Sequence, residues 1–267
     1  MRGRGQAILA AFQFLSRFPV RAQLDFTPEL LKRSTSFYPL VGAAIGLATC
    51  LLSLICAWAL PPLPASVIIL AGWIYLTGGL HLDGWMDTAD GLLSYRSREK
   101  MLEIMKDSRV GAMGVIACVL LLMLKAALIA SFLEKGALPL ALLTVPLWSR
   151  WFMVHAIAGW PAARGSEGLA GRFGGMKNYS SQIAGLWALV LSGAALVLLK
   201  ICGYGEGLNW LQLGICYAAV PAAAWLIGRF AANKISSRLG GLTGDTYGAL
   251  NEGLEVILML ILVIIIR

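Results

Sequence analysis

The sequence predicts an all-α fold, a polytopic integral membrane bundle of about seven transmembrane helices forming one domain over residues 1–267. Hydrophobic residues make up 58% of the chain and charged residues 13%, whereas soluble domains hold about 45–50% and about 25%. Apolar runs long enough to cross roughly 30 Å of hydrocarbon recur along the chain. The third observation is the distribution of the basic residues, which predicts how the bundle is oriented in the membrane.

An N-terminal segment precedes the apolar runs. It carries Arg2 and Arg4, and Arg17 interrupts the apolar stretch that follows them. We expect this segment to form an amphipathic helix in the membrane interface. Its lipid-facing residues would be Ile8, Phe12, Leu15 and Phe18. The expected transmembrane runs are residues 38–60, 65–80, 112–133, 137–157, 183–201, 211–231 and 254–266.

The basic residues are concentrated on one side of this predicted bundle. With a cytoplasmic N-terminus, 17 of the 22 basic residues, Lys177 among them, fall on the cytoplasmic side. Three, including Arg267, fall outside, and Lys125 and Arg150 lie within apolar runs. Such a bias predicts a cytoplasmic N-terminus. It also accounts for the net charge of +8, so the lipid bilayer is an expected partner and nucleic acid is not.

The stretch HLDGWMDTADG, residues 81–91, contains three carboxylates. On a helix, Asp83, Asp87 and Asp90 stand at i, i+4 and i+7 and share one face. Each would cost about 2.5–3.5 kcal/mol at the centre of a bilayer, so we expect them to face water, a cavity or a cation. Oxygen ligands of this kind suit Mg²⁺, and we predict these three residues as its ligands. The alternative is a helix end whose aspartates are only solvated.

A second acidic group lies in GLTGDTYGALNEGLE, before the last apolar run. Asp245 and Glu252 stand at i and i+7 of a helix. We expect them to face the first group and to complete one site. The alternative is an ordinary helix start in which Asp245 is the N-cap. His81 should point away from the face of Asp83, and a structural and a functional role are equally expected for it.

Two cationic segments complete the candidate site. One holds Lys106, Asp107 and Arg109, and the other holds Arg164 and Arg172. Arginine among glycines suits bidentate contacts with phosphate. The positive-inside rule alone also places basic residues in such segments. Together with the two acidic groups, these segments favour a phosphate site.

Six blocks carry a resemblance to a known family. They are FLSRFPV (14–20), FYPLVGAAIG (37–46), GGLHLDGWMDTADGL (78–92), MKDSRVGAMGV (105–115), AARGSEGLAGRF (162–173) and GLTGDTYGALNE (241–252). Together they resemble the cobalamin synthase family, the adenosylcobinamide-GDP ribazoletransferases. The resemblance implies transfer of the phospho-cobinamide moiety of adenosylcobinamide-GDP to α-ribazole or its 5′-phosphate, with release of GMP. It also implies the inner membrane of a prokaryote, an active site facing the cytoplasm, and other cobalamin-assembly enzymes as partners.

This reaction gives the candidate residues their expected roles. A diphosphate is cleaved, so Mg²⁺ at the aspartates would neutralise its charge. Lys106, Arg109 and Arg164 would hold the diphosphate and the departing GMP. Asp90 or Asp245 would take the proton of the attacking hydroxyl. The expected catalytic residues are Asp83, Asp87, Asp90 and Asp245, and the expected substrate-binding residues are Lys106, Asp107, Arg109, Arg164, Arg172 and Glu252.

Two alternative functions stay open at this point. The family is distantly similar to the CDP-alcohol phosphotransferases, which make phospholipids and carry D-x2-D-G-x2-A-R followed by G-x3-D-x3-D. Asp87, Asp90 and Gly91 fit the opening, but Ser94 and Tyr95 replace Ala-Arg and the second half is missing. The other alternative is a Mg²⁺ carrier or secondary transporter. It would place acidic residues at mid-span and in paired repeats, and no repeat is visible.

Overall fold

The computed structural model describes residues 2–176, 178–204 and 209–266. Lys177 and Arg267, which contribute to the predicted charge bias, lie outside the described residues. In those ranges the chain is helical, apart from connections and one isolated bridge between Ala162 and Leu242. The elements are α1 (Arg2–Leu15), α2 (Pro28–Ser34), η1 (Thr35–Phe37), α3 (Tyr38–Ala59), α4 (Pro62–Thr77), α5 (Leu80–Leu93), α6 (Arg98–Ile104), α7 (Ala112–Glu134), α8 (Leu138–Gly159), α9 (Gly168–Arg172), α10 (Asn178–Ile201), α11 (Trp210–Leu239) and α12 (Gly244–Ile265).

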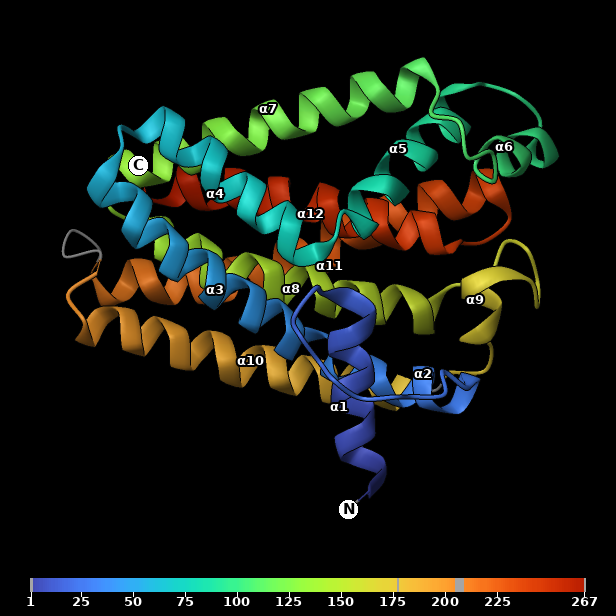
Figure 1. Ribbon diagram of the computed structural model, residues 1–267, viewed down its shortest axis with the longest axis horizontal. Helices are drawn as coiled ribbons and strands as arrows, with labels where there is room; N and C mark the ends of the chain where they lie inside the picture. Colours follow the sequence, from blue (N-terminus) through green and yellow to red (C-terminus); the bar gives the residue numbers. More distant parts are fainter. Residues whose placement is uncertain (1, 177, 205–208, 267) are drawn as a thin grey trace.

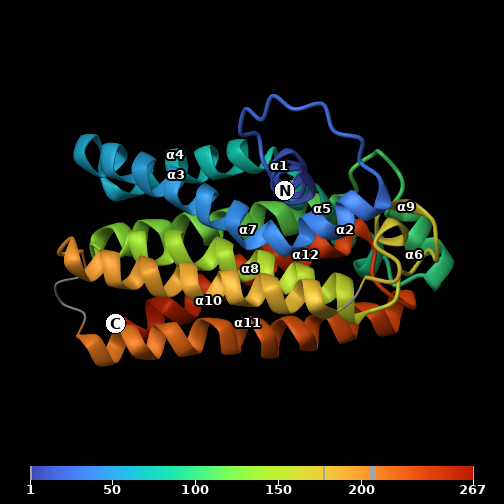
Figure 2. The same ribbon diagram turned by 90° about the horizontal axis from the view of Figure 1, so that it is seen from below.

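The predicted multi-pass helical bundle is confirmed. The seven apolar runs fall on α3, α4, α7, α8, α10, α11 and α12. Within the described ranges, six helical stretches are long and apolar enough to cross a membrane. The pair α4 and α5, bent by 92°, gives a seventh if it is counted as one span. The long helices run side by side, and α1 lies across them (Figures 1 and 2).

The short helices gather at one end of the long ones. In both views α2, α5, α6 and α9 lie at this end, which we call the loop-rich end, and the C-terminus lies towards the other (Figures 1 and 2). Most residues of α8 are buried, which places this helix at the centre of the bundle. Gly42 and Gly46 of α3 lie directly against its backbone. Close packing around α8 therefore fixes the frame on which the loop-rich end is built.

Helix α1 packs against protein more closely than the sequence predicted. A stripe of small side chains, Ala7, Ala10 and Ala11, is buried with Leu15. Small residues allow two helices to approach closely. Leu15, which was expected to face lipid, therefore lies in the protein core instead. The helix ends at this residue, so Phe18 lies beyond it and packs against the same core.

Helix α12 begins at Gly244, well before the apolar run expected from residue 254. The cap is reciprocal: the Thr246 backbone N–H donates to the Thr243 hydroxyl, and the Thr243 backbone N–H donates to the Thr246 hydroxyl. The alternative interpretation of Asp245 as the N-cap is therefore wrong, and Asp245 lies in the first turn. The polar start of α12 is helical because it is packed within the protein, where Tyr247 and Asn251 are buried.

Glycines allow α5 and α12 to cross at close range. A Cβ at Gly84 of α5 would lie 2.5 Å from the carbonyl oxygen of Asp245. A Cβ at Gly248 of α12 would lie 3.1 Å from the backbone of His81. Neither backbone can give way easily. The two acidic segments are thus held against each other at this crossing.

Replacing Gly84 with Ala should lower stability. Alanine in place of a helical glycine normally adds about 1 kcal/mol, but at Gly84 the methyl group would collide with the backbone of α12, and overpacking costs about 1–3 kcal/mol. Gly214→Ala in α11 is the matched control, because nothing lies within 4 Å of its added Cβ. Thermal unfolding in detergent should show a lower midpoint for Gly84→Ala alone. An unchanged or higher midpoint would contradict the close crossing.

Candidate active site

A pair of glycines turns the chain between α4 and α5 and sets the direction in which the acidic face of α5 points. Gly78 ends α4 and Gly79 caps α5, with φ angles of +66° and +72°. These left-handed conformations are accessible to glycine at little cost. They produce the 92° bend between the two helices. As a result, Asp83 is exposed and Asp87 is half-buried at the loop-rich end.

The two acidic segments adjoin each other at Asp245, where α5 and α12 cross. Gly84 lies against the backbone of Asp245, so the first turn of α12 adjoins the acidic face of α5. Asp87 is half-buried, and the charged side chains that act on its carboxylate are Asp83, Asp245 and Asp90, together with Arg164. Like charges this close favour a cation between them. The crossing therefore builds a concentrated negative field from two helices.

Arg164 is held beside this acidic group by backbone pairing. The Ala163 N–H donates to the Leu242 carbonyl at 2.9 Å, and the Leu242 N–H donates to the Pro161 carbonyl at 2.8 Å. This pairing fixes the loop before α9 against the start of α12. The Arg164 Nη1 then lies 3.8 Å from the Asp245 carboxylate. Its Nη2 donates to the Leu102 carbonyl at 3.1 Å, whereas its buried Nε has no hydrogen-bond partner within residues 2–176, 178–204 and 209–266.

Some of these groups line a cavity of about 130 Å³, whereas Asp87 and Asp90 are not among its lining residues. Asp83, Asp245, Arg164 and His81 contribute its polar lining, and Tyr247 is among the aromatic residues around them. The cavity thus combines anionic oxygens, one guanidinium and an apolar wall. Such a concave site with a few convergent polar groups is typical of ligand binding.

Asp90 has a structural contact that the sequence did not indicate. Its two carboxylate oxygens accept from the backbone N–H groups of Gly111 and Gly114, each at 2.7 Å. These donors belong to the first turn of α7, where N–H groups lack helical partners. Asp90 therefore caps α7 from α5. Its predicted role as a Mg²⁺ ligand stays a prediction.

The predicted cationic segments lie at the same end but are mostly exposed. Lys106 pairs with Glu167 at 3.6 Å, and Arg172 is exposed on α9. Asp107 and Arg109 pair with each other at 2.7 Å. The hydrogen bonds from Arg109 lower the pKa of Asp107 to about 2. Of the predicted basic residues, only Arg164 among the described side chains both lines the cavity and contacts Asp245.

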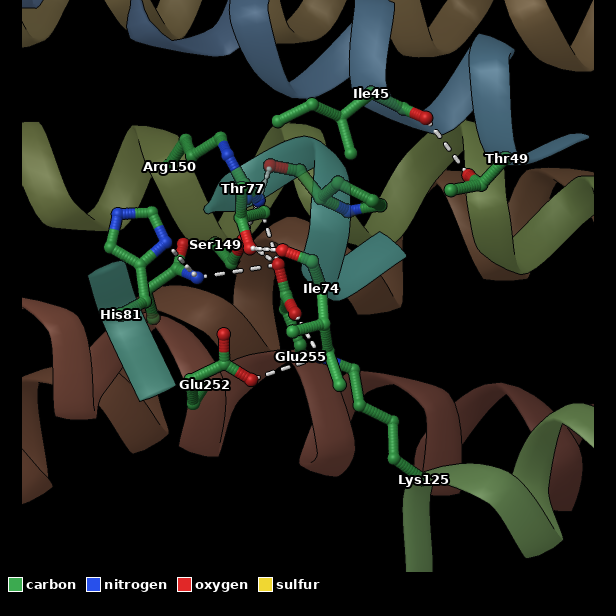
Figure 3. A network of polar contacts seen from close by, with 12 residues as sticks. Ile45, Thr49, Ile74, Thr77, His81, Lys125, Ser149, Arg150, Glu252 and Glu255 are labelled. Atoms are coloured by element: carbon green, nitrogen blue, oxygen red, sulfur yellow. Dashed lines mark hydrogen bonds and ion pairs between the residues drawn. The ribbon is translucent and has the colours of Figure 1, made fainter. Parts of the chain in front are cut away.

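Glu252 lies in a buried charge network (Figure 3). Its carboxylate is 3.0 Å from Lys125 of α7, which also contacts Glu255 closely. Glu255 in turn lies 2.7 Å from Arg150 of α8. The two cations and two anions are almost completely buried. Glu252 therefore does not line the cavity with Asp245, and its predicted substrate contact stays a prediction.

The sequence contained a signal for this network. Lys125 and Arg150 stand alone in apolar runs, and Glu255 stands in the last run. Charged residues inside membrane helices pair with one another because an unpaired charge is costly there. Matching the two cations with Glu252 and Glu255 of the last helix would have predicted the network.

The carboxylates fit a metal only in part. Within residues 2–176, 178–204 and 209–266, no three His, Cys, Asp or Glu side chains are grouped so that they could hold a metal ion. Mg²⁺ is commonly bound through one or two carboxylates, with water and substrate phosphates completing the shell. Asp83, Asp87 and Asp245 offer oxygen donors under mutual repulsion, which is the chemistry such a shared site requires.

Fold and site together define a multi-pass membrane protein whose helical bundle holds an acidic, arginine-lined cavity at one end. The family model for cobalamin-5-phosphate synthase matches residues 7–263. The chain belongs to this family, and the predicted family membership is confirmed.

Similar proteins cover nearly the whole chain. The adenosylcobinamide-GDP ribazoletransferase of Brevibacillus brevis is 35% identical over 96% of this chain and 97% of its own. The enzyme of the same name from Desulforamulus reducens is 42% identical over 92% of this chain and 91% of its own. No solved structure matches the chain.

Proposed function

We propose that this protein is an adenosylcobinamide-GDP ribazoletransferase. It transfers the phospho-cobinamide moiety of adenosylcobinamide-GDP to α-ribazole or its 5′-phosphate and releases GMP, the final step of cobalamin assembly. One observation supports this function most directly: Asp83, Asp245 and Arg164 come from three separate segments and line one cavity. A diphosphate needs both a cationic contact and neutralisation of its charge where the bond breaks.

Mg²⁺ is the cofactor that we propose for this site. Asp83 and Asp87, which stand on one face of α5, would hold it together with phosphate oxygens of the substrate. When bound, Mg²⁺ supplies charge neutralisation at the diphosphate. Asp90 is the less suitable ligand of α5, since both of its oxygens already accept backbone hydrogen bonds.

The remaining roles follow from position. Arg164 binds the diphosphate within the cavity that Asp83 of α5 also lines, with its side chain anchored on the Leu102 carbonyl. Lys106 and Arg109 lie at the exposed edge, where they attract the anionic substrate. Asp245 is the better candidate for the base that takes the hydroxyl proton, because it lines the cavity and Asp90 does not. The attacking hydroxyl reaches this carboxylate within the same space.

The site faces the cytoplasm in this proposal. The loop-rich end carries Lys106, Arg109 and Arg164, which the positive-inside rule places on the cytoplasmic side. The membrane is then the inner membrane of a prokaryote, where the soluble nucleotide substrate and GMP are accessible. Other enzymes of cobalamin assembly are further partners that this position permits.

A product assay tests the function. Membranes containing the protein are given adenosylcobinamide-GDP, α-ribazole and Mg²⁺, and GMP is followed by chromatography. We expect GMP and a cobalamin product in equal amounts. In a parallel reaction supplied with CDP-diacylglycerol, we expect no release of CMP. Release of CMP would instead support the phospholipid-making alternative. Mg²⁺ flux into proteoliposomes without GMP would support a carrier.

Removal of divalent cations should stop the reaction. With excess chelator we expect GMP release to fall to background, because the diphosphate and three carboxylates then repel one another. Added Mg²⁺ in excess of the chelator should restore it, and added Na⁺ should not. Full product formation in chelator would contradict a metal at the site.

A further inference from the structure

The cavity contains a histidine that the proposed mechanism does not use. His81 is 3% exposed and is one of the residues that line the cavity. Its Nδ1 lies 3.2 Å from the side-chain amide nitrogen of Asn251 in α12. Its other ring nitrogen, Nε2, is buried and has no hydrogen-bond partner among the residues that the structure describes. The question is which nitrogen carries the proton.

Asn251, which is hydrogen-bonded to the buried charge network, determines which ring nitrogen of His81 carries the proton. The Asn251 amide nitrogen also donates to a Glu255 carboxylate oxygen at 3.3 Å. Reversing the amide would place its oxygen against that carboxylate, which can only accept. Glu255 itself is held by Arg150 and Lys125. The NH₂ group of Asn251 therefore faces both Glu255 and His81.

The ring of His81 is thereby held in one neutral tautomer. An amide NH₂ group only donates, so Nδ1 must accept and carries no proton. The proton is then on Nε2, which points away from the network (Figure 3). A buried donor without an acceptor is unfavourable and rare in native proteins. The acceptor that satisfies it would come with the ligand of the cavity.

We propose that His81 contacts the substrate, with its Nε2–H donating to a phosphoryl oxygen of the diphosphate. This inference rests on the proposed function. The oxygen is the matching acceptor because Arg164 gives the same cavity a preference for anionic oxygen. Asn251 and Glu255 are positioning residues that act through His81. The neutral donor orients the phosphoryl group without adding a charge beside the aspartates.

Three substitutions at one position separate a donor from a packing role. His81→Phe and His81→Asn should lower kcat/KM for adenosylcobinamide-GDP by about 10- to 100-fold. His81→Gln should stay within about threefold, because its terminal amide places a donor near the position of Nε2, whereas the shorter Asn side chain cannot. KM for α-ribazole should not change. A purely structural histidine would make Gln no better than Asn.

The second histidine supplies a matched control. His155 is partly buried, its Nδ1 lies 3.4 Å from the Ser181 hydroxyl, and its Nε2 lacks a hydrogen-bond partner in the described part of the chain. It stacks on Trp151 and does not line the cavity. His155→Phe and His155→Gln should leave kcat/KM unchanged. Equal losses at both positions would overturn the proposal.

A spectroscopic measurement reads the tautomer directly. The chain has two histidines, so in His155→Gln the ¹⁵N NMR signals of imidazole come from His81 alone. We expect the Nε2–H tautomer, a shift of Nε2 on addition of adenosylcobinamide-GDP, and loss of the single tautomer in Asn251→Leu. An Nδ1–H tautomer, or no shift with substrate, would overturn the proposal.

The outcomes also separate this inference from the proposed function. If Asp83→Asn stops GMP release while every His81 variant keeps wild-type kcat/KM, the contact is wrong and the function stands. If the wild-type protein releases no GMP, the function fails. The response of Nε2 to the substrate then still decides the contact, since it requires binding and not turnover.

Discussion

Asp83→Asn and Asp87→Asn should each lower GMP release by about 10³-fold, with no loss of protein from the membrane. Asparagine keeps the shape of the side chain and removes the negative charge that would hold Mg²⁺ at the diphosphate. Folding should not suffer, because Asp83 and Asp245 repel Asp87 and removal of one charge relieves that repulsion. The thermal midpoint in detergent should therefore stay equal or rise.

Asp25→Asn is the matched control for these variants. Asp25 is exposed in the connection between α1 and α2 and is not among the residues that line the cavity. GMP release by this variant should equal that of the wild type. Normal turnover in Asp83→Asn or Asp87→Asn would remove that residue from the mechanism, and a parallel loss of thermal stability would reduce the role to a structural one.

The second large effect concerns stability. Lys125→Met should cost about 3–5 kcal/mol, because Glu252 and Glu255 both pair with Lys125 and would keep a buried negative charge without it. The cation also lies 4.3 Å from the ring centroid of Trp73, a contact that methionine replaces only in part. We expect a strongly lowered thermal midpoint and less monodisperse protein after extraction in detergent.

A matched control and a rescue test this origin of the effect. Lys135→Met, at the exposed end of α7, should change the midpoint little. Adding Glu252→Gln to Lys125→Met restores a neutral network and should recover much of the loss. If the double variant is no more stable than Lys125→Met, the cost comes from packing and not from the unpaired charge.

Helices of the bundle could be predicted from the sequence because lipid imposes long apolar runs. Every expected run falls largely on a helix, and the helical spacing of the acidic residues predicted that Asp83 and Asp87 share one face. The contacts of Leu15, Asp90 and Glu252 could not be predicted in this way. Each depends on which helix lies beside it, and neither periodicity nor composition carries that information. Arg164 is an intermediate case. An arginine among glycines indicated a phosphate contact, but its place beside Asp245 depends on the backbone pairing of its loop with Leu242.

The buried charge network has a consequence for how the chain matures. Lys125 and Arg150 lie in α7 and α8, whereas both of their carboxylate partners lie in α12, the last helix. During synthesis the two cations enter the bilayer before either counter-charge exists. Until the C-terminal helix arrives, the nascent bundle holds two uncompensated positive charges. A chain that stops before α12 therefore keeps both cations without the carboxylates that pair with them in the finished bundle.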